Sequence, residues 1–306
     1  MKKPVSLVLS SGGARGMAHI GVIEELERQN FEIKAISGSS IGALVGGIYA
    51  TGHIQEYKEW VSDLNKLDVF KLMDFSISSH GFIKGVKVFN EINRFIGDML
   101  IEDLPIPFTA VATDANNQKE VVFRKGRLRD AIRASVSIPS VLEPFNFNGV
   151  SLIDGGILNP IPLDLVKRTE GDILIAVDLN AIVPLKKIKK PKQTLTQKRK
   201  EQSSILKRIE FKEQWVRFFP KDKNHKEKLG HLSLLDRSYD MMQNKISRYA
   251  IHEYKPDIVV SISKTACSTF DFYRADEMIE LGKRTFNEEL RKYDQKMIKK
   301  FRDSVE

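Results

Sequence analysis

Residues 31–49, FEIKAISGSSIGALVGGIY, decide the fold that the sequence predicts. Residues 31–36 alternate as a short strand does, and residues 41–49 are apolar and rich in small side chains, as the start of a buried helix is. Between them lies the pattern G-x-S-x-G, centred on Ser40. A serine on a tight turn between a strand and a buried helix has an exposed hydroxyl group, and the helix N-terminus stabilises an anion beside it. The stretch therefore predicts a nucleophile elbow, the turn that presents a reactive serine.

The same five-residue pattern also fits a simpler interpretation. Gly38 and Gly42 allow the backbone angles of a tight turn without a Cβ clash, and an ordinary turn that caps a helix uses them in the same way. The strand before Ser40 and the helix after it favour the elbow, because this context is what the motif requires.

The composition is that of an ordinary globular protein. The 306 residues suffice for one large domain or two small ones, and 42% of them are hydrophobic. Cys267 is the only cysteine, which excludes a disulfide framework within the chain and favours a reducing compartment. The apolar run at residues 5–9 is too short for a signal peptide, and no apolar stretch approaches the ~20 residues of a membrane-spanning helix. The sequence therefore predicts a cytoplasmic protein.

Positive charge is concentrated in one segment. The formal net charge is +9, and residues 183–228 hold 16 Lys and Arg against 5 Asp and Glu. Such a segment indicates an anionic partner, either a membrane surface or a nucleic acid, or else a solvated insertion. Within it, residues 205–219 mix aromatic side chains with Arg and Lys, which suits the interface of an anionic membrane. A lid over the Ser40 site is a second functional interpretation, and the structural alternative is a helix packed over the mouth of that site as part of the core.

A glycine-rich turn, S-S-G-G-A-R-G, follows the first expected strand at residues 5–9 and precedes a helix at residues 17–29. Backbone amides at such a turn can point outward together and bind an anion. The candidate anions are a nucleotide phosphate and the oxyanion of an acyl-transfer intermediate.

Of these two anions, the oxyanion fits the turn better. Ser11 stands where the dinucleotide pattern G-x-G-x-x-G needs its first glycine, and no acid ends the second strand. The amides near Gly12 and Gly13 are therefore the candidate oxyanion hole. Arg15 of this turn either orients the loop through backbone carbonyl groups or is a solvated residue of the first helical turn.

Asp154 ends another short apolar strand, residues 149–154, and is followed by Gly155 and Gly156. Ligands of open α/β sheets bind at the carboxyl ends of the strands, which makes Asp154 a candidate site residue. The alternative is an aspartate in an ordinary surface turn. After this turn, the sequence predicts a helix that ends at Arg168 and a buried strand at residues 172–179.

A reactive serine needs a base that takes its proton at neutral pH. Histidine is the usual base, and the chain has six: His19, His53, His80, His225, His231 and His252. None of them sits at the end of an expected strand, where a base opposite the elbow belongs, whereas Asp154 does. His252 is the histidine that would complete a Ser-Asp-His triad in a small-ester hydrolase, which is an alternative interpretation.

Three motifs, in this order, resemble the patatin-like phospholipase family: G-G-x-R-G after the first strand, G-x-S-x-G after the second, and D-G-G further on. Residues 112–114 and 134–139 also resemble family segments. The resemblance covers residues 4–179 and resumes at residues 257–281. It implies a three-layer α/β/α fold with a central, mostly parallel sheet and helices on both faces.

The resemblance also implies a Ser-Asp dyad without a histidine. Ser40 would be the nucleophile that attacks an acyl-ester carbonyl of a lipid, and Asp154 would be the proton acceptor. The amides of Gly12, Gly13 and Ala14 would form the oxyanion hole, with no metal and no cofactor. Residues that support these motifs are Arg15, Gly16, Gly38, Gly42, Gly155 and Gly156. Ser11, in place of the first loop glycine, departs from the family pattern and bears on the geometry of the loop.

The expected organisation is one domain with an insertion. Residues 4–180 form the patatin-like core, residues 181–230 the basic insertion, and residues 231–306 the helices and strand that complete the domain. The expected partners are an acyl-lipid substrate and, through residues 183–228, an anionic membrane that the cytoplasmic protein contacts peripherally.

Nucleic-acid binding and a non-catalytic role are two further possibilities for this sequence. Nucleic-acid binding is not expected, because no recognisable module surrounds the lysines. A non-catalytic lipid-binding or regulatory protein on the same fold is the alternative from another class. The intact motifs around Ser40 and Asp154 argue against it.

Overall fold

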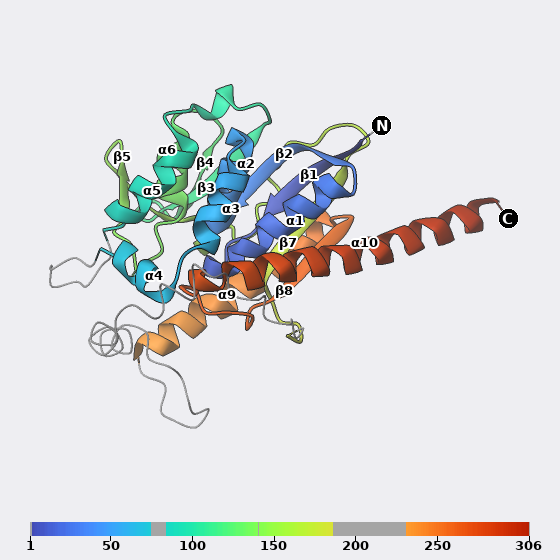
Figure 1. Ribbon diagram of the computed structural model, residues 1–306. Coiled ribbons are helices and arrows are strands. Elements are labelled where there is room, and N and C mark those ends of the chain that lie inside the picture. Colours follow the sequence, from blue (N-terminus) through green and yellow to red (C-terminus); the bar gives the residue numbers. More distant parts are fainter. Residues whose placement is uncertain (1, 75–83, 140, 186–230, 306) are drawn as a thin grey trace.

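The described part of the chain folds around an eight-stranded mixed sheet (Figure 1). The computed structural model describes residues 2–74, 84–139, 141–185 and 231–305. The strands are β1 Lys3–Leu9, β2 Phe31–Ser39, β3 Phe108–Asp114, β4 Lys119–Phe123, β5 Phe145–Phe147, β6 Val150–Asp154, β7 Ile173–Ala181 and β8 Ile258–Ser263. The helices are α1 Met17–Arg28, α2 Ile41–Thr51, α3 Ile54–Ser62, α4 Lys66–Leu72, α5 Val86–Ile96, α6 Leu128–Ser135, α9 His231–Tyr254 and α10 Ala275–Val305. Short 3-10 helices are η1 Gly13–Gly16, η2 Ile101–Asp103, η3 Gly155–Ile157 and η4 Phe272–Arg274.

The order of the strands brings the two predicted turns to one edge of the sheet. The order is β5-β6-β3-β2-β1-β7-β8, with β4 also paired to β3. β1 and β2 are parallel neighbours, and Leu9 at the end of β1 is in register with Gly38 near the end of β2. The glycine-rich turn after β1 and the G-x-S-x-G turn after β2 therefore lie side by side.

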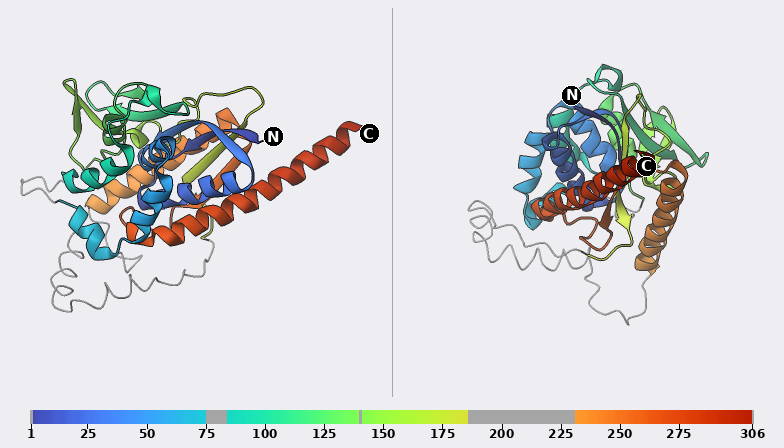
Figure 2. Two further views of the ribbon diagram at one scale, coloured as in Figure 1. Left: turned by 45° about the horizontal axis from the view of Figure 1, so that its top comes forward. Right: turned by 90° about the vertical axis from the view of Figure 1, so that its right-hand side faces the viewer.

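Helices cover both faces of the sheet. Along β1, Leu7 and Leu9 point into the larger apolar cluster, which also holds side chains of α1, α2 and α10. Val8 points to the opposite face, into a smaller cluster packed against Ala250 and Ile251 of α9. Figure 2 shows α9 and α10 on opposite sides of the sheet. The predicted three-layer fold with a mostly parallel central sheet is confirmed.

The helix predicted up to Arg168 is wrong. Residues 159–168 form turns and bends instead, and the carbonyl oxygen of Lys167 accepts from Ser6 Oγ of β1 at 2.9 Å rather than from a helical amide. The carbonyl groups of the two prolines in this segment are used by other elements: Pro160 O accepts from Ser11 N at 2.8 Å, and Pro162 O accepts from Ser37 Oγ at 2.7 Å. The segment therefore supports the glycine-rich turn and β2 directly.

The C-terminal part of the chain packs on the same sheet. β8 is paired with β7, and α10 runs along α1 before its last turns project away from the body (Figure 1). Most of the predicted basic insertion lies outside the described residues, which resume at 231. Among the described helices, none has both the length and the apolar composition to cross a membrane.

Candidate active site

Ser40 occupies the strained turn between β2 and α2. Its φ angle is 54° and its ψ angle −123°, which is costly for a residue with a side chain and is typical of functional sites. The turn is held by Ser135 of α6, whose Oγ accepts from Ser40 N at 2.9 Å and donates to Val111 O at 2.7 Å. Sequence reasoning assigned no role to Ser135, although it lies in the segment 134–139 that resembles the family.

Gly42 allows the two turns to approach each other. A Cβ atom at this position would lie only 2.1 Å from the carbonyl oxygen of Leu9, at the end of β1. Any side chain here would push the start of α2 away from the glycine-rich turn. The other motif glycines lie in the same turns: Gly12 and Gly16 at the two ends of the turn after β1, Gly38 in β2, and Gly155 and Gly156 in η3.

The structure brings Asp154 to Ser40. The Oγ atom of Ser40 lies 2.5 Å from Oδ2 of Asp154 and donates a hydrogen bond to it. β6 runs antiparallel to β3, so Asp154 does not reach the site by the rule for parallel strands. β6 overlaps only the end of β3, with Asp154 opposite Ala112, and this register brings Asp154 level with the end of β2.

Burial changes the pKa of the Asp154 carboxylate. The residue is only 1% exposed, and this burial raises its pKa to about 7, since a desolvated charge is disfavoured. Hydrogen bonds from the Ser40 hydroxyl and the Gly156 amide oppose the rise in pKa, and so does the neighbouring Tyr239 hydroxyl. The Gly156 amide donates to Oδ1 at 2.7 Å. A carboxylate poised near neutral pH can take a proton and return it.

The glycine-rich turn offers two of the three predicted oxyanion amides. The prediction is wrong for Ala14, because its amide already donates to the carbonyl oxygen of Thr269 at 2.8 Å. Among the described residues, the amides of Gly12 and Gly13 have no protein acceptor. Gly13 has a φ angle of 57° and lines the same cavity as Ser40.

Arg15 is buried beneath this turn and holds it by backbone carbonyl groups. Its guanidinium donates to Leu179 O at 3.1 Å, Lys264 O at 3.2 Å and Cys267 O at 3.3 Å, and to Asn180 Oδ1 at 3.3 Å. Burial lowers the pKa of Arg15, and the neighbouring side chains of Cys267, Asp240 and Asp178 oppose this shift. Of the two interpretations of Arg15, the geometry fits the orienting one.

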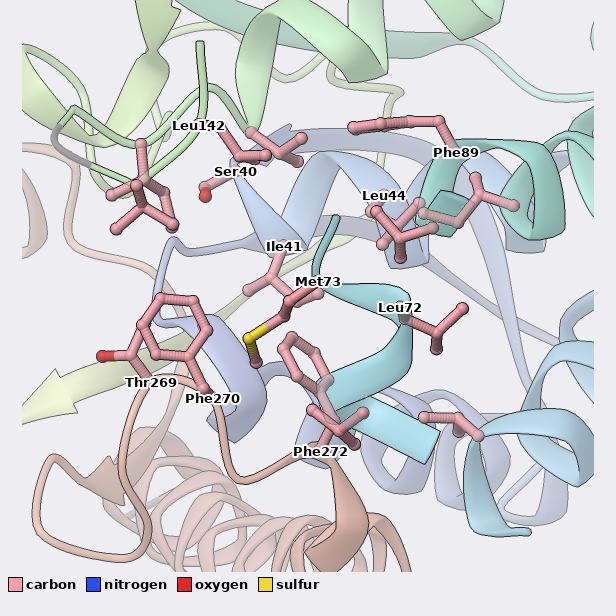
Figure 3. A pocket seen from close by; sticks show the side chains of 18 of the residues that line it. Ser40, Ile41, Leu44, Leu72, Met73, Phe89, Leu142, Thr269, Phe270 and Phe272 are labelled. Atoms are coloured by element: carbon pink, nitrogen blue, oxygen red, sulfur yellow. The ribbon is translucent and has the colours of Figure 1, made fainter. Parts of the chain in front are cut away.

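An apolar cavity of about 150 Å³ begins at Ser40 (Figure 3). Side chains from α2, α3, α4, α5, the segment after α6 and the segment before α10 surround it. Apart from Gly13 and Ser40, they include Ile41, Leu44, Tyr57, Trp60, Leu72, Met73, Phe89, Leu142, Phe270 and Phe272. A hydrocarbon group fits such a lining, and Ser40 lies in the cavity wall, where it can reach an ester group attached to that chain.

The structure does not bring His252 to the serine. His252 is exposed near the end of α9, nine residues beyond Gln243, whose side chain reaches the site. Nine residues of helix rise by ~13 Å, so His252 lies about that far along α9 from the residue that reaches the site. His19 is buried, with Nε2 on the carbonyl oxygen of Ser10, and its pKa is lowered to about 4 by burial. His53 is exposed at the start of α3.

Comparison with known proteins agrees with this geometry. The family model for the patatin-like phospholipase matches residues 7–167. An NTE family protein of Mycobacterium tuberculosis, described as uncharacterized, is 33% identical over 320 residues, covering 91% of this chain and 89% of that protein. The chain belongs to the patatin-like phospholipase family, as its three motifs predict.

The chain is also similar to two more distant proteins, one by sequence and one by structure. Lysophospholipase NTE1 of Candida albicans is 32% identical over 186 residues, which is 58% of this chain and 13% of that larger protein. The crystal structure of VipD from Legionella pneumophila aligns with 95% of this chain and 67% of its own, at a TM-score of 0.48 and 13% identity. Similarity at that level adds nothing to the family assignment.

Proposed function

We propose that this protein hydrolyses fatty-acyl esters of lipids, as a phospholipase A or lysophospholipase does. The observation that carries the proposal is the direct hydrogen bond between Ser40 and the buried Asp154, at the edge of an apolar cavity. The name of the Candida albicans relative, a lysophospholipase, supports the same class of substrate.

The proposed reaction uses Ser40 as nucleophile and Asp154 as its only base. Asp154 takes the proton as the Ser40 oxygen attacks the ester carbonyl carbon, and the amides of Gly12 and Gly13 stabilise the resulting oxyanion. The carbon–oxygen bond to the alcohol then breaks, and Asp154 returns the proton to the leaving alkoxide. Water, deprotonated by Asp154, attacks the acyl-serine and releases a fatty acid, and the proton returns to Ser40.

Release of fatty acid from mixed phospholipid and lysophospholipid vesicles tests this proposal. We expect the wild-type protein to release fatty acid and the folded Ser40→Ala variant to release none above background. Mass spectrometry of both products identifies the class of ester that is cut. Absence of any acyl-ester cleavage by the folded wild-type protein would refute the proposed function, and so would equal release by Ser40→Ala.

The cavity predicts a dependence on acyl-chain length. Leu44 is buried one turn after Ser40 and lines the cavity, so a Leu44→Trp variant fills space that the acyl chain would occupy. We expect kcat/KM to fall ~10-fold for palmitoyl esters, the equivalent of about two buried methylene groups, and to change little for butyryl esters. The measurement compares both esters of the same alcohol. Leu100→Trp, at an exposed position outside the cavity lining, is the matched control.

Contact with an anionic membrane through residues 183–228 stays a prediction. Residues 186–230 lie outside the described residues, and so does the alternative of a lid formed by them. The cytoplasmic, membrane-peripheral location of the protein likewise stays a prediction. Binding of the full chain to vesicles with and without anionic lipid, at low and high salt, measures the contact directly.

A further inference from the structure

The last turns of α10 extend beyond the body of the protein (Figure 1 and Figure 2). Earlier in the helix, apolar side chains up to Leu290 are buried in the larger apolar cluster. From residue 294 to residue 304 every residue is exposed, yet three of them are large and apolar: Met297 is 45%, Ile298 56% and Phe301 71% exposed. Large apolar side chains grouped on one exposed surface indicate that something other than water covers them.

The three apolar residues lie on one face of α10. Phe301 follows Met297 by four residues, which puts it about one turn further along the same side, and Ile298 is next to Met297. At 3.6 residues per turn, the three side chains leave the helix within an arc of about 100°. That is the width of the apolar stripe of an amphipathic helix.

Positive charge accompanies this face. Residues 295–302, QKMIKKFR, hold four Lys and Arg and no acidic residue. Asp294 and Asp303 lie on either side of that segment, and residues 294–304 together keep a net charge of +2, from four cations and two carboxylates. The surface therefore favours an anionic partner over a cationic one.

The cations surround the apolar face rather than interrupt it. Lys300 and Arg302 fall on its two borders, and Lys296 and Lys299 fall on the opposite side of the helix. All four residues are exposed. An apolar face with Lys and Arg at its borders and behind it is typical of a helix that lies in the plane of a membrane surface.

We propose that residues 294–304 of α10 dock on the surface of an anionic membrane. Met297, Ile298 and Phe301 enter the boundary between the headgroups and the acyl chains, and the lysines and the arginine contact the anionic headgroups. The long aliphatic stems of these cations let the charged groups stay in the polar layer while the apolar face is buried. Binding of a membrane by this surface is separate from the reaction at Ser40, so the inference does not depend on the proposed function.

Charge and area both disfavour a second copy of this chain as the occupant. Pairing of two copies through this face would bring together the cations on its borders, and like charges repel. A stable protein interface covers ~800 Å² on each partner. Three side chains do not supply that area, because even a large aromatic one buries no more than ~250 Å². An anionic membrane attracts the cations and covers the apolar face at once.

Binding of the full chain to vesicles of phosphatidylcholine and phosphatidylserine tests the proposal. All proteins carry Ser40→Ala, so that the proposed reaction does not consume the lipid. We expect Ile298→Ser with Phe301→Ser to weaken binding by ~10-fold or more, because two apolar side chains no longer enter the lipid. The matched control is Met241→Ser with Met242→Ser on α9, at positions 59% and 56% exposed, which is expected to leave binding unchanged. Equal affinity of the two double variants overturns the proposal.

The need for anionic lipid is tested by removing charge from the same surface. Lys299→Gln with Lys300→Gln is expected to weaken binding ~10-fold on vesicles that contain phosphatidylserine and to leave binding to pure phosphatidylcholine unchanged. Lys125→Gln with Lys167→Gln removes the same charge from exposed positions elsewhere and is the matched control. A loss of the same size in both double variants would show that only the net charge of the protein matters, and it would overturn the docking of α10.

A fluorescent label reports directly whether this end of α10 enters the membrane. Ser304→Cys places a reactive thiol beside the apolar face, and the native Cys267 is buried. An environment-sensitive dye on residue 304 is expected to shift to the blue when the protein binds vesicles, and the same dye on Met241→Cys is expected not to shift. Bound protein whose dye at residue 304 keeps its aqueous spectrum would overturn the proposal and assign the binding to another part of the chain.

Light scattering distinguishes the membrane from a second copy of the chain. We expect the wild type and the variant with Ile298→Ser and Phe301→Ser to have the same mass in solution. A dimer that dissociates in this variant, without a change in vesicle binding, would identify a second copy as the occupant and overturn the proposal. Failure of the proposed function has a different signature, the absence of acyl-ester cleavage by the folded wild-type protein, and leaves these binding results unaffected.

Discussion

The Asp154→Asn variant is expected to lose about 10⁴-fold in kcat, because an amide cannot take the proton of Ser40 and the described residues bring no second base to it. Asparagine matches aspartate in shape, so the Gly156 amide keeps an acceptor oxygen and the turn keeps its geometry. The measurement is the hydrolysis rate of an acyl ester at about pH 8, where Asp154 of the wild type is charged. A rate within ten-fold of the wild type would contradict the dyad.

The same variant is expected to change how stability depends on pH. The folded protein holds a proton on Asp154 with a pKa of about 7, whereas the unfolded chain releases it near 3.8. Between these values the folded state binds more protons, so the free energy of unfolding of the wild type falls as pH rises. The free energy of unfolding of Asp154→Asn does not fall in this way. The difference in free energy of unfolding between the variant and the wild type is therefore expected to shift by about 2.5 kcal/mol in favour of the variant between pH 5 and pH 8.

Urea unfolding of both proteins at the two pH values measures this difference. Ser40→Ala, which keeps Asp154, serves as the control and is expected to follow the wild-type pH dependence in direction. A stability difference between Asp154→Asn and wild type that stays constant from pH 5 to pH 8 would show that Asp154 titrates alike in the folded and unfolded chains. In that case burial would not raise the pKa of Asp154 in the folded protein.

Gly42→Ala is expected to unfold the protein or to lower its free energy of unfolding by about 3 kcal/mol or more, at the upper end of overpacking costs. The added Cβ would lie 2.1 Å from the carbonyl oxygen of Leu9 and 2.8 Å from that of Ser10, and neither is the end of a flexible side chain. The start of α2 would have to move away from the glycine-rich turn, and Ser40 would move with it.

Soluble yield and urea unfolding measure this effect against a glycine in the same helix. Gly52 ends α2 with a φ angle of 87°, and nothing lies within 4 Å of an added Cβ. Gly52→Ala is therefore expected to cost only the left-handed backbone strain, about 1 kcal/mol. If Gly42→Ala costs no more than Gly52→Ala, the close approach of the two turns is not needed for folding.

The sequence predicts the parts of the site that lie in short, ordered motifs. A strand, a glycine turn and a buried helix are local features, and Ser40 sits where they place it. The pairing of Ser40 with Asp154 is a long-range contact that periodicity cannot predict, and the family motifs supplied it. The rule for parallel strands does not account for the position of Asp154, because β6 is antiparallel and only its short overlap with β3 puts the residue at the site.

Contacts between distant segments could not be predicted. Gln243 donates to the carbonyl oxygen of Gly156 across 87 residues of sequence, and a polar side chain of this kind is common on any helix. The engaged amide of Ala14 depends on a carbonyl oxygen of the segment before α10, which no local pattern reveals. In place of the helix expected before Arg168, the chain forms turns in which the Lys167 carbonyl oxygen accepts from Ser6 of β1, another contact between distant segments.

Covalent trapping shows directly whether Ser40 is the nucleophile of the proposed reaction. A long-chain alkyl fluorophosphonate mimics the ester, and the attacking serine oxygen displaces its fluoride. Tryptic mass spectrometry then locates the adduct. We expect one adduct per chain, on Ser40, formed in step with loss of hydrolysis and strongly slowed in Asp154→Asn. An adduct on another residue that abolishes hydrolysis, or full hydrolysis after Ser40 is modified, would contradict this role of Ser40.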